Sequence, residues 1–305
     1  MSLSPETASA LEHAGLDPGE VERVVRAALE EDLLWGPDVT SSATIPPGTV
    51  ATADIVARAP GVVSGLPVVL AVLDISGSPA GSAEELLPDG SPVWPGDRVA
   101  TLEAPLANLL GAERTLLNFL THLSGIATCT ARWVQAVSGT DCQVRDTRKT
   151  LPGLRCLEKY AVRCGGGVNH RMGLGDAALI KDNHVLAAGG VARAVAAVRA
   201  AHPGIPLEVE CDTVAQVREA LAAGAELILL DNMSLAEIRE SLAAGTDHPG
   251  VRWEASGGLR LGTVSQVAET GVDYVAVGAL THSSPVLDLG LDLRDPSPPP
   301  GGCTS

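Results

Sequence analysis

The feature that most constrains the fold of this 305-residue chain is an alternation of short apolar runs with helical stretches after about residue 140. The apolar runs read CQVRD, AALIK, PLEVE, ELILL, RWEAS and DYVAVG, and stretches such as VARAVAAVRAA and TVAQVREALAAG lie between them. Alternation of strands and helices predicts a parallel sheet with right-handed crossovers. We expect an α/β barrel, incomplete because only six strands are clear, or an open doubly wound sheet.

The earlier part of the chain has a different, α+β pattern. Residues 50–58 and 93–102 read as strands, and residues 65–74 and 105–137 read as helices, the second interrupted by Gly111 and Gly125. A first helix is expected to begin near Pro18, because Asp17 can cap it and valines follow at helical spacing. The final segment DPSPPPGGCTS cannot form a regular element, and we expect residues 296–305 to be disordered.

Composition and charge exclude several classes of function. The net charge of −16 and an aromatic content of 2% argue against a nucleic-acid-binding protein, which needs a basic surface and stacking side chains. The six cysteines form no CxxC pair, so we expect reduced thiols and a cytoplasmic protein. No signal peptide or long apolar run is apparent, so no membrane association is expected.

Charged or glycine-rich groups follow every predicted strand of the second part. The six runs end in Thr147-Arg148-Lys149, Lys181, Glu210, Asp231, Ser256-Gly257-Gly258 and Gly278. The carboxyl ends of parallel strands converge on one edge or one mouth, which is where α/β proteins build their active sites. The sequence therefore predicts that these residues meet in space.

The cations among them predict an anionic ligand. Eight of the 21 lysines and arginines lie in residues 145–181, including Arg148, Lys149, Arg171 and Lys181, with His170 beside Arg171. Like charges about 5 Å apart repel by roughly 3 kcal/mol at an effective dielectric constant of about 20, and a multiply charged anion removes this cost. Two arginines and two lysines suit a ligand that carries both carboxylates and phosphates. The alternative is that these cations are ordinary solvated strand ends.

Each of the remaining strand-end residues has two possible roles. Glu210 and Asp231 could accept hydrogen bonds from sugar hydroxyls or hold Mg²⁺ through water, or they could simply balance the cations. The glycines after the last two strands could expose backbone N–H groups to a phosphate, or could only form turns. His170 and His184 have no partner at metal-ligand spacing and are interpreted as hydrogen-bonding groups.

One long block resembles a known family. The stretch DTRKTLPGLRCLEKYAVRCGGGVNHRMGLGDAALIKDNH (146–184) is similar to the central signature of quinolinate phosphoribosyltransferases. LEVECDT, LILLDNMS, EASGGL and VAVGALTHS resemble the later strands of that family in order, and GAERTLLNFLTHLSGIAT resembles its linking helix. The resemblance covers roughly residues 20–290.

The resemblance implies a fold, a reaction and an assembly. It implies an N-terminal α/β sandwich domain (1–120) joined by a C-terminal segment (281–295), and an incomplete, seven-stranded α/β barrel (121–280). The implied reaction is transfer of phosphoribosyl from 5-phosphoribosyl-1-pyrophosphate to quinolinate, yielding nicotinate mononucleotide, pyrophosphate and CO₂ in de novo NAD biosynthesis. Mg²⁺ is the implied cofactor. The implied assembly is a homodimer, with higher oligomers left open, in which one subunit's sandwich domain covers the partner's barrel mouth.

The resemblance also implies roles for individual residues. Arg148, His170, Arg171 and Lys181 would bind the quinolinate carboxylates, and Arg114 would reach the neighbouring subunit's site. Lys149 would face the pyrophosphate side and the reacting centre, and Thr147 would bind substrate beside it. Glu210 and Asp231 would hold the ribose hydroxyls directly or through Mg²⁺. Lys149, Lys181, Glu210 and Asp231 form the implied catalytic set. The 5′-phosphate would lie against Ser256, Gly257, Gly258, Gly278 and Ala279.

Other functions remain open from the sequence. A paralogue associated with molybdenum transport shares this fold and part of the motif, and a non-catalytic sensor of sugar phosphates would use the same cations. The complete HRMGLGDAALIKDNH with Lys181 favours the enzyme. The chain departs from the family pattern at Pro37, which is expected to alter a loop, and at the third residue of SGG, Gly258.

Overall fold

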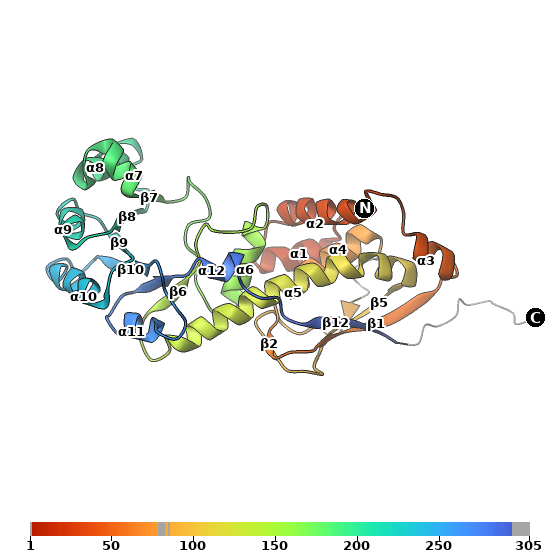
Figure 1. Cartoon of the computed structure of the whole chain (residues 1–305). Helices are drawn as coiled ribbons and strands as arrows, with labels where there is room; N and C mark the ends of the chain where they lie inside the picture. The colour runs from red at the N-terminus through yellow and green to blue at the C-terminus, as the bar shows by residue number, and fades with distance from the viewer. Residues whose placement is uncertain (1, 79–82, 85, 295–305) are drawn as a thin grey trace, which may run out of the picture. The chain divides into compact units, whose positions relative to one another are not determined.

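The computed structural model describes residues 2–78, 83–84 and 86–294 of the chain (Figure 1). They form two compact units: the first comprises the described residues of 1–129, 151–166 and 283–305, and the second comprises residues 130–150 and 167–282. The boundary between the units at residues 129 and 130 and the predicted boundary at residues 120 and 121 both fall inside one helix, and residues 151–166 group with the first unit. The tail expected at 296–305 lies outside the described residues.

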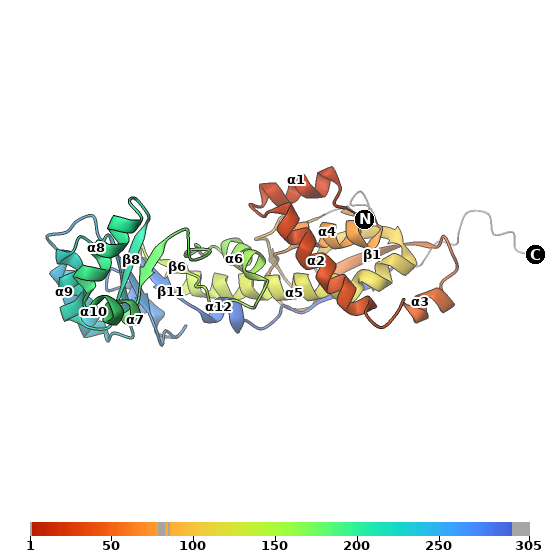
Figure 2. The ribbon, with the colours of Figure 1, turned by 90° about the horizontal axis from the view of Figure 1, so that it is seen from above.

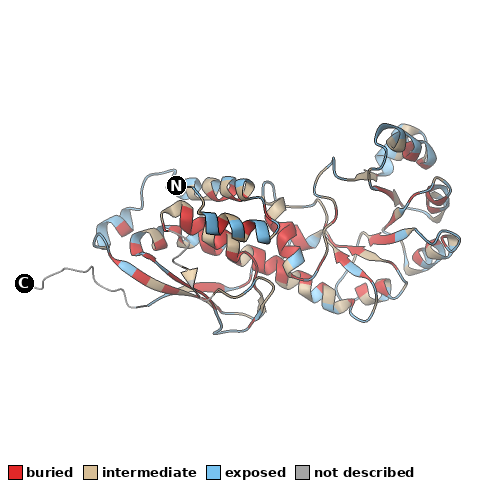
Figure 3. Cartoon of the chain, turned by 180° about the vertical axis from the view of Figure 1, so that it is seen from behind, coloured by how far each residue is buried: buried red, intermediate tan, exposed pale blue. Residues whose placement is uncertain are grey.

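The first unit is built on an antiparallel sheet with the strand order β12-β1-β5-β3. Its strands are β1 (Val50–Ala57), β3 (Ala83–Glu84), β5 (Arg98–Pro105) and β12 (Leu289–Leu293), and β2 (Gly61–Val62) pairs separately with β4 (Pro92–Val93). Alternate residues of β1 are buried, as expected for a strand with one face on a core (Figure 3). The C-terminal strand β12 pairs with β1, with Ile55 opposite Leu291.

Helices complete the first unit. They are α1 (Pro5–His13), α2 (Pro18–Leu33), α3 (Val39–Thr44), α4 (Leu66–Ser76), α5 (Leu106–Ala136) and α6 (Arg155–Cys164). The predicted cap of α2 is present, because Asp17 accepts a hydrogen bond from the backbone N–H of Glu20 at 2.8 Å. Pro37 lies in the loop before α3, which Asp38 caps through Thr40 and Ser41.

Helix α5 is continuous, contrary to the predicted interruptions at its two glycines. Gly111 lies on an open face, whereas Gly125 is where another segment approaches the helix: a Cβ there would lie 2.2 Å from the carbonyl oxygen of Pro285. Gly125 is therefore explained by close packing rather than by a helix break.

The second unit contains the predicted parallel sheet, in the order β6-β11-β10-β9-β8-β7. The strands are β6 (Gln143–Arg145), β7 (Ala178–Ile180), β8 (Leu207–Cys211), β9 (Leu227–Asp231), β10 (Arg252–Ser256) and β11 (Tyr274–Ala276). All six predicted strands are present, and every pairing between them is parallel. This sheet has six strands among the described residues rather than the implied seven, and an isolated parallel bridge joins Val168 to Arg145.

Helices alternate with these strands. They are α7 (Asp182–Ala188), α8 (Val191–Ala201), α9 (Val214–Ala222), α10 (Leu235–Ala244), α11 (Val264–Ala268) and α12 (Ala279–His282). Helices α8, α9 and α11 pack against β7, β8 and β11 respectively. Figure 2 shows α8 and α9 near β8. This arrangement puts the carboxyl ends of six strands on one edge, where the loops to the helices begin.

Among the described residues, no single helix has the length and apolar composition needed to cross a membrane. Only α7 and α8, taken together across an 89° bend, meet those two criteria.

Candidate functional site

A cavity of about 340 Å³ opens at the carboxyl ends of the strands in the second unit. It is lined by nine of the fourteen predicted site residues, namely Thr147, Arg148, Lys149, His170, Arg171, Lys181, Glu210, Asp231 and Ser256, together with Leu179, Leu229, Glu254 and Ala276. The predicted convergence of strand ends therefore occurs. The size is within the range of small-molecule sites.

Arg148 and Arg171 form a pair of cations in this cavity. The pKa of the Arg171 guanidinium is lowered by burial and by the charge of Arg148. The Nε atom of each arginine is buried and has no hydrogen-bond partner among the described residues. Buried donors without partners are costly, and an anion placed between the two guanidinium groups would both satisfy the donors and remove the repulsion.

His170 occupies a fixed position between two hydrogen-bond partners. Its Nδ1 accepts the backbone N–H of Arg171 at 2.7 Å, and its Nε2 lies 2.7 Å from Oε2 of Glu208. Because Nδ1 accepts a hydrogen bond, Nε2 carries a ring proton and donates it to Glu208. The backbone N–H of His170 is anchored separately by Asp146 Oδ1 at 2.8 Å.

Two buried glutamates lie beneath the cavity. Glu208 is 3% exposed and Glu254 is fully buried, and Glu254 Oε1 lies 3.6 Å from His170 Nε2. Arg145 Nη1 donates to Glu254 Oε2 at 2.6 Å, and its guanidinium stacks on the Tyr274 ring at 4.4 Å. Burial, and then the charge of Glu208, raise the pKa of Glu254.

His170, Glu208 and Glu254 offer potential metal ligand atoms within 4.8 Å of one another. Nε2 of His170 carries the proton that it donates to Glu208. A nitrogen that binds a metal must be free of its proton, so this hydrogen bond argues against a metal at the cluster. The nearby Arg145 cation adds further repulsion. We therefore interpret the cluster as a hydrogen-bonded network.

The carboxylates predicted at the strand ends lie on adjacent strands. Lys181 Nζ lies 2.8 Å from Oε2 of Glu210. Asp231 Oδ2 accepts a hydrogen bond from Asn232 Nδ2 at 2.7 Å. Each carboxylate thus keeps one oxygen facing its own partner and a second oxygen for a hydroxyl, a water or a hydrated cation.

The glycines after β10 and β11 permit close backbone approach. Gly257 has φ +83°, and a Cβ there would lie 2.3 Å from Asn232 Oδ1. At Gly278 a Cβ would lie 2.9 Å from Lys149 Cδ, so only glycine leaves room for the lysine stem. Of these predicted residues, Gly257, Gly258, Gly278 and Ala279 follow the strand ends but do not line the cavity.

Lys149 is held by its neighbours. Its backbone N–H donates to Thr147 Oγ1 at 3.0 Å, and its carbonyl accepts the Thr281 hydroxyl at 2.8 Å. Arg114 is an exposed residue of α5 in the first unit and is not among the lining residues.

Sequence reasoning missed Glu208 and Glu254. A signal was present, because Glu208 precedes the predicted Glu210 by two residues in LEVEC, and Glu254 precedes Ser256 by two in RWEAS. Residues two apart on a strand point to the same face, so the predicted members already indicated which face these glutamates share.

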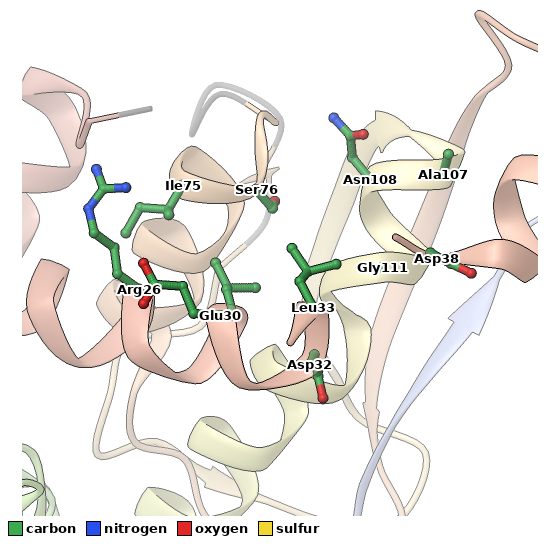
Figure 4. Close-up of a pocket in the computed structure, with 11 residues that line it drawn as sticks. Arg26, Glu30, Asp32, Leu33, Asp38, Ile75, Ser76, Ala107, Asn108 and Gly111 are labelled. Atoms are coloured by element: carbon green, nitrogen blue, oxygen red, sulfur yellow. The ribbon is translucent and has the colours of Figure 1, made fainter. Parts of the chain in front are cut away.

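The first unit has a cavity of similar size, about 360 Å³, between the ends of α2 and α4 and the start of α5 (Figure 4). Its charged lining residues are Arg26, Glu30, Asp32 and Asp38. Three acids against one cation do not suit an anionic ligand, so the cation-lined cavity of the second unit is the better candidate site.

Comparison with known proteins agrees with this geometry. Residues 38–124 match the family model for the quinolinate phosphoribosyl transferase N-terminal domain, and residues 126–292 match that for its C-terminal domain. A nicotinate-nucleotide pyrophosphorylase [carboxylating] from Mycobacterium leprae is 53% identical over 271 residues, which cover 88% of this chain and 95% of that protein. The human protein of the same name is 37% identical, covering 91% of this chain and 93% of that protein.

Comparison with solved structures points to the same family. The crystal structure of NadC from Streptococcus pyogenes superimposes with a TM-score of 0.84 at 39% identity, covering 92% of this chain and 99% of that chain. Both units, and not the parallel sheet alone, therefore have counterparts in these relatives. The chain belongs to the quinolinate phosphoribosyl transferase family.

Proposed function

We propose that this protein transfers the phosphoribosyl group of 5-phosphoribosyl-1-pyrophosphate to quinolinate with loss of CO₂, giving nicotinate mononucleotide and pyrophosphate for NAD biosynthesis. The observation that carries the proposal is one cavity with two buried, unpartnered arginine Nε donors beside two carboxylates on adjacent strand ends. The two arginines suit the anionic groups of the substrates, and the two carboxylates suit the hydroxyls of the sugar.

Arg148, Arg171 and Lys181 would bind the quinolinate carboxylates. Arginine grips a carboxylate through paired hydrogen bonds, and the unpartnered Nε atoms are suitable donors for such a contact. His170 is interpreted differently from the expectation that it binds a carboxylate, because both ring nitrogens already have protein partners. Its contribution is to position its neighbour Arg171.

Glu210 and Asp231 would receive the ribose hydroxyls, and Lys149 would face the pyrophosphate. The backbone after β10, at Ser256, Gly257 and Gly258, together with Gly278 and Ala279, would hold the 5′-phosphate. Support comes from the glycines that follow β10 and β11, which have no side chain to cover their backbone N–H groups.

The binding residues named above suffice for the proposed transfer, which needs no covalent nucleophile. The bond from ribose C1 to the pyrophosphate oxygen breaks with its electron pair going to pyrophosphate, and the lone pair of the pyridine nitrogen forms the new bond to C1. The protein orients the two ligands and stabilises the departing charge. The bond from ring C2 to its carboxylate then breaks, leaving its electron pair beside the positive nitrogen, and a proton takes the place of CO₂.

Mg²⁺ is part of this proposal. The oxygen donors of Glu210 and Asp231 suit a hard cation that keeps most of its waters, and the partners Lys181 and Asn232 leave one oxygen of each carboxylate for it. A bound Mg²⁺ would neutralise charge on the pyrophosphate leaving group.

A homodimer completes the proposal. Arg114 is exposed on α5 of the first unit, where it could enter a neighbouring subunit's cavity. Trp35 is 94% exposed, with Leu34 and Val39 exposed nearby, and a second copy would cover such apolar surface. We place the enzyme in the cytoplasm, supported by the free thiols of the five described cysteines.

The test is a turnover assay with the purified full chain. Quinolinate labelled at the 2-carboxylate, 5-phosphoribosyl-1-pyrophosphate and Mg²⁺ should release labelled CO₂ in equal amounts with nicotinate mononucleotide. Nicotinate, which lacks the 2-carboxylate, should be a poor substrate. Absence of product from quinolinate, with a folded protein, would reject the proposal.

A further inference from the structure

A layer of buried side chains lies at the base of the cavity, and of its members only His170 is among the expected ligand contacts. We call it the floor and define it as Arg145, His170, Glu208 and Glu254. Below the floor, a second cavity of about 390 Å³ is lined by residues from the starts of β7 to β11, and His170 and Arg171 line both cavities. The floor therefore separates the ligand cavity from the opposite end of the sheet.

We propose that Glu208 is a positioning residue that sets Arg171 for the pyridine dicarboxylate by fixing the His170 ring. This inference rests on the proposed function and deepens it.

The contacts form one chain from Glu208 to the ligand cavity. Glu208 Oε2 accepts the Nε2–H of His170 at 2.7 Å, which fixes the rotation of the ring and its tautomer. The ring then offers an unprotonated Nδ1 to the backbone N–H of Arg171 at 2.7 Å. The far end of Arg171 is held by the carbonyl of Ala177, to which Nη1 donates at 2.8 Å. Both ends of the arginine are thus fixed, while its buried Nε has no hydrogen-bond partner among the described residues.

The burial of Glu208 supports a positioning role. A carboxylate that is 3% exposed is costly in a protein interior, and its Oε1 has no partner among the described residues. A purely structural position in this strand would be filled more stably by an apolar residue. Among the described residues, the Glu208 carboxylate forms its one hydrogen-bonded pair with the ring that adjoins Arg171.

The experiment compares Glu208→Gln with Glu208→Met in the full chain. Glutamine keeps an oxygen that accepts the Nε2–H, whereas methionine fills a similar volume without it. Glu226→Gln is the matched control, because Glu226 lines the lower cavity but is exposed and paired with Arg199. Steady-state kinetics are measured for each substrate, and the tautomer of His170 is read by ¹⁵N NMR of histidine-labelled protein.

Glu208→Met should raise the KM for quinolinate about tenfold, with the KM for 5-phosphoribosyl-1-pyrophosphate unchanged. Glu208→Gln and Glu226→Gln should stay close to the unaltered protein. His170 should show a protonated Nε2 and an unprotonated Nδ1 in the unaltered protein and in Glu208→Gln. A general loss of protein stability would not raise the KM for quinolinate while leaving the KM for 5-phosphoribosyl-1-pyrophosphate unchanged.

Several outcomes would overturn the positioning role. They are an unchanged KM for quinolinate in Glu208→Met, an equal loss in Glu208→Gln, or a protonated Nδ1 of His170 in the unaltered protein. The NMR measurement decides the case if Glu208→Met does not fold. An unaltered protein that makes no product would instead reject the proposed function, whatever the tautomer of His170.

Discussion

Lys181 Nζ lies 2.8 Å from Glu210 Oε2, so that a cation at the end of β7 neutralises a carboxylate at the end of the neighbouring strand β8. The lysine is half exposed, whereas the Glu210 side chain is 13% exposed. Both residues line the cavity, and the lysine is the more exposed member of the pair.

Arg171→Ala should lower kcat/KM for quinolinate by about 100-fold or more, because charge-assisted hydrogen bonds contribute ~1.5–3 kcal/mol each. Arg218→Ala is the matched control, since Arg218 is an exposed helix residue paired with Glu240. Steady-state kinetics at fixed Mg²⁺ make the comparison. Equal losses in the two variants would contradict the assignment of Arg171 to the carboxylates.

Glu210→Gln and Asp231→Asn should each raise the Mg²⁺ concentration needed for half-maximal activity, by about tenfold, because each removes one anionic oxygen donor. Asp212→Asn changes an exposed carboxylate two residues from Glu210 and should leave the requirement unchanged. Activity titrated with Mg²⁺ measures the effect. A shift as large in Asp212→Asn would point to general electrostatics instead.

Mixing Arg114→Ala chains with Arg171→Ala chains should restore activity, if Arg114 acts across the dimer. Random exchange makes half of the dimers mixed, and each mixed dimer has one intact site of two, so about a quarter of full activity is expected. Native mass spectrometry would establish that mixed dimers formed. Mixed dimers without activity would rule out a shared site.

The two glycines of α5 should respond in opposite directions to alanine. Gly111→Ala meets open space and should stabilise the protein by ~0.5–1 kcal/mol, since alanine has the higher helix propensity. Gly125→Ala should destabilise it by ~1–3 kcal/mol, because its Cβ would overlap the Pro285 backbone. Denaturant unfolding of both variants is the measurement, and a stabilised Gly125→Ala would disprove the close contact.

Asp54 should make the first unit sensitive to acid. Burial alone would raise the pKa of Asp54, but hydrogen bonds from Arg294 and Thr101 and the charge of Arg294 outweigh it and lower that pKa. Its stabilising effect is therefore present above the ordinary carboxyl pKa and is lost as the pH falls through the lowered folded-state pKa.

The variant Asp54→Asn tests the direction of this pH dependence. The variant should have a lower unfolding midpoint than the unaltered protein at neutral pH, and the difference should shrink toward pH 3. Thermal unfolding followed across this range provides the measurement. A difference that does not depend on pH would show that the Asp54 charge is not responsible.

The sequence predicted most of the second unit because its signals are local and repetitive. Each apolar run is bounded by a helical stretch, and parallel strands necessarily bring Lys181, Glu210 and Asp231 to one edge. The position of the cavity could therefore be predicted from the topology of the parallel strands, without any prediction of side-chain packing.

The remaining features depend on contacts between distant parts of the chain. Nothing near Gly125 in the sequence indicates that Pro285 approaches it, and the glycine therefore reads as a helix break. The orientation of the His170 ring likewise depends on Glu208, 38 residues further along, and on a backbone N–H whose direction only the folded loop defines. Local pattern cannot supply either relationship.

The pairing of β12 with β1 has a consequence for biosynthesis. The edge partner of Val50–Ala57 is the last strand among the described residues, so the first sheet stays incomplete until Leu289–Leu293 have left the ribosome. The parallel sheet, by contrast, has all its strands once residue 276 has emerged. The catalytic half can therefore mature first, and a nascent chain that terminates early would leave an unsatisfied β-edge open to aggregation.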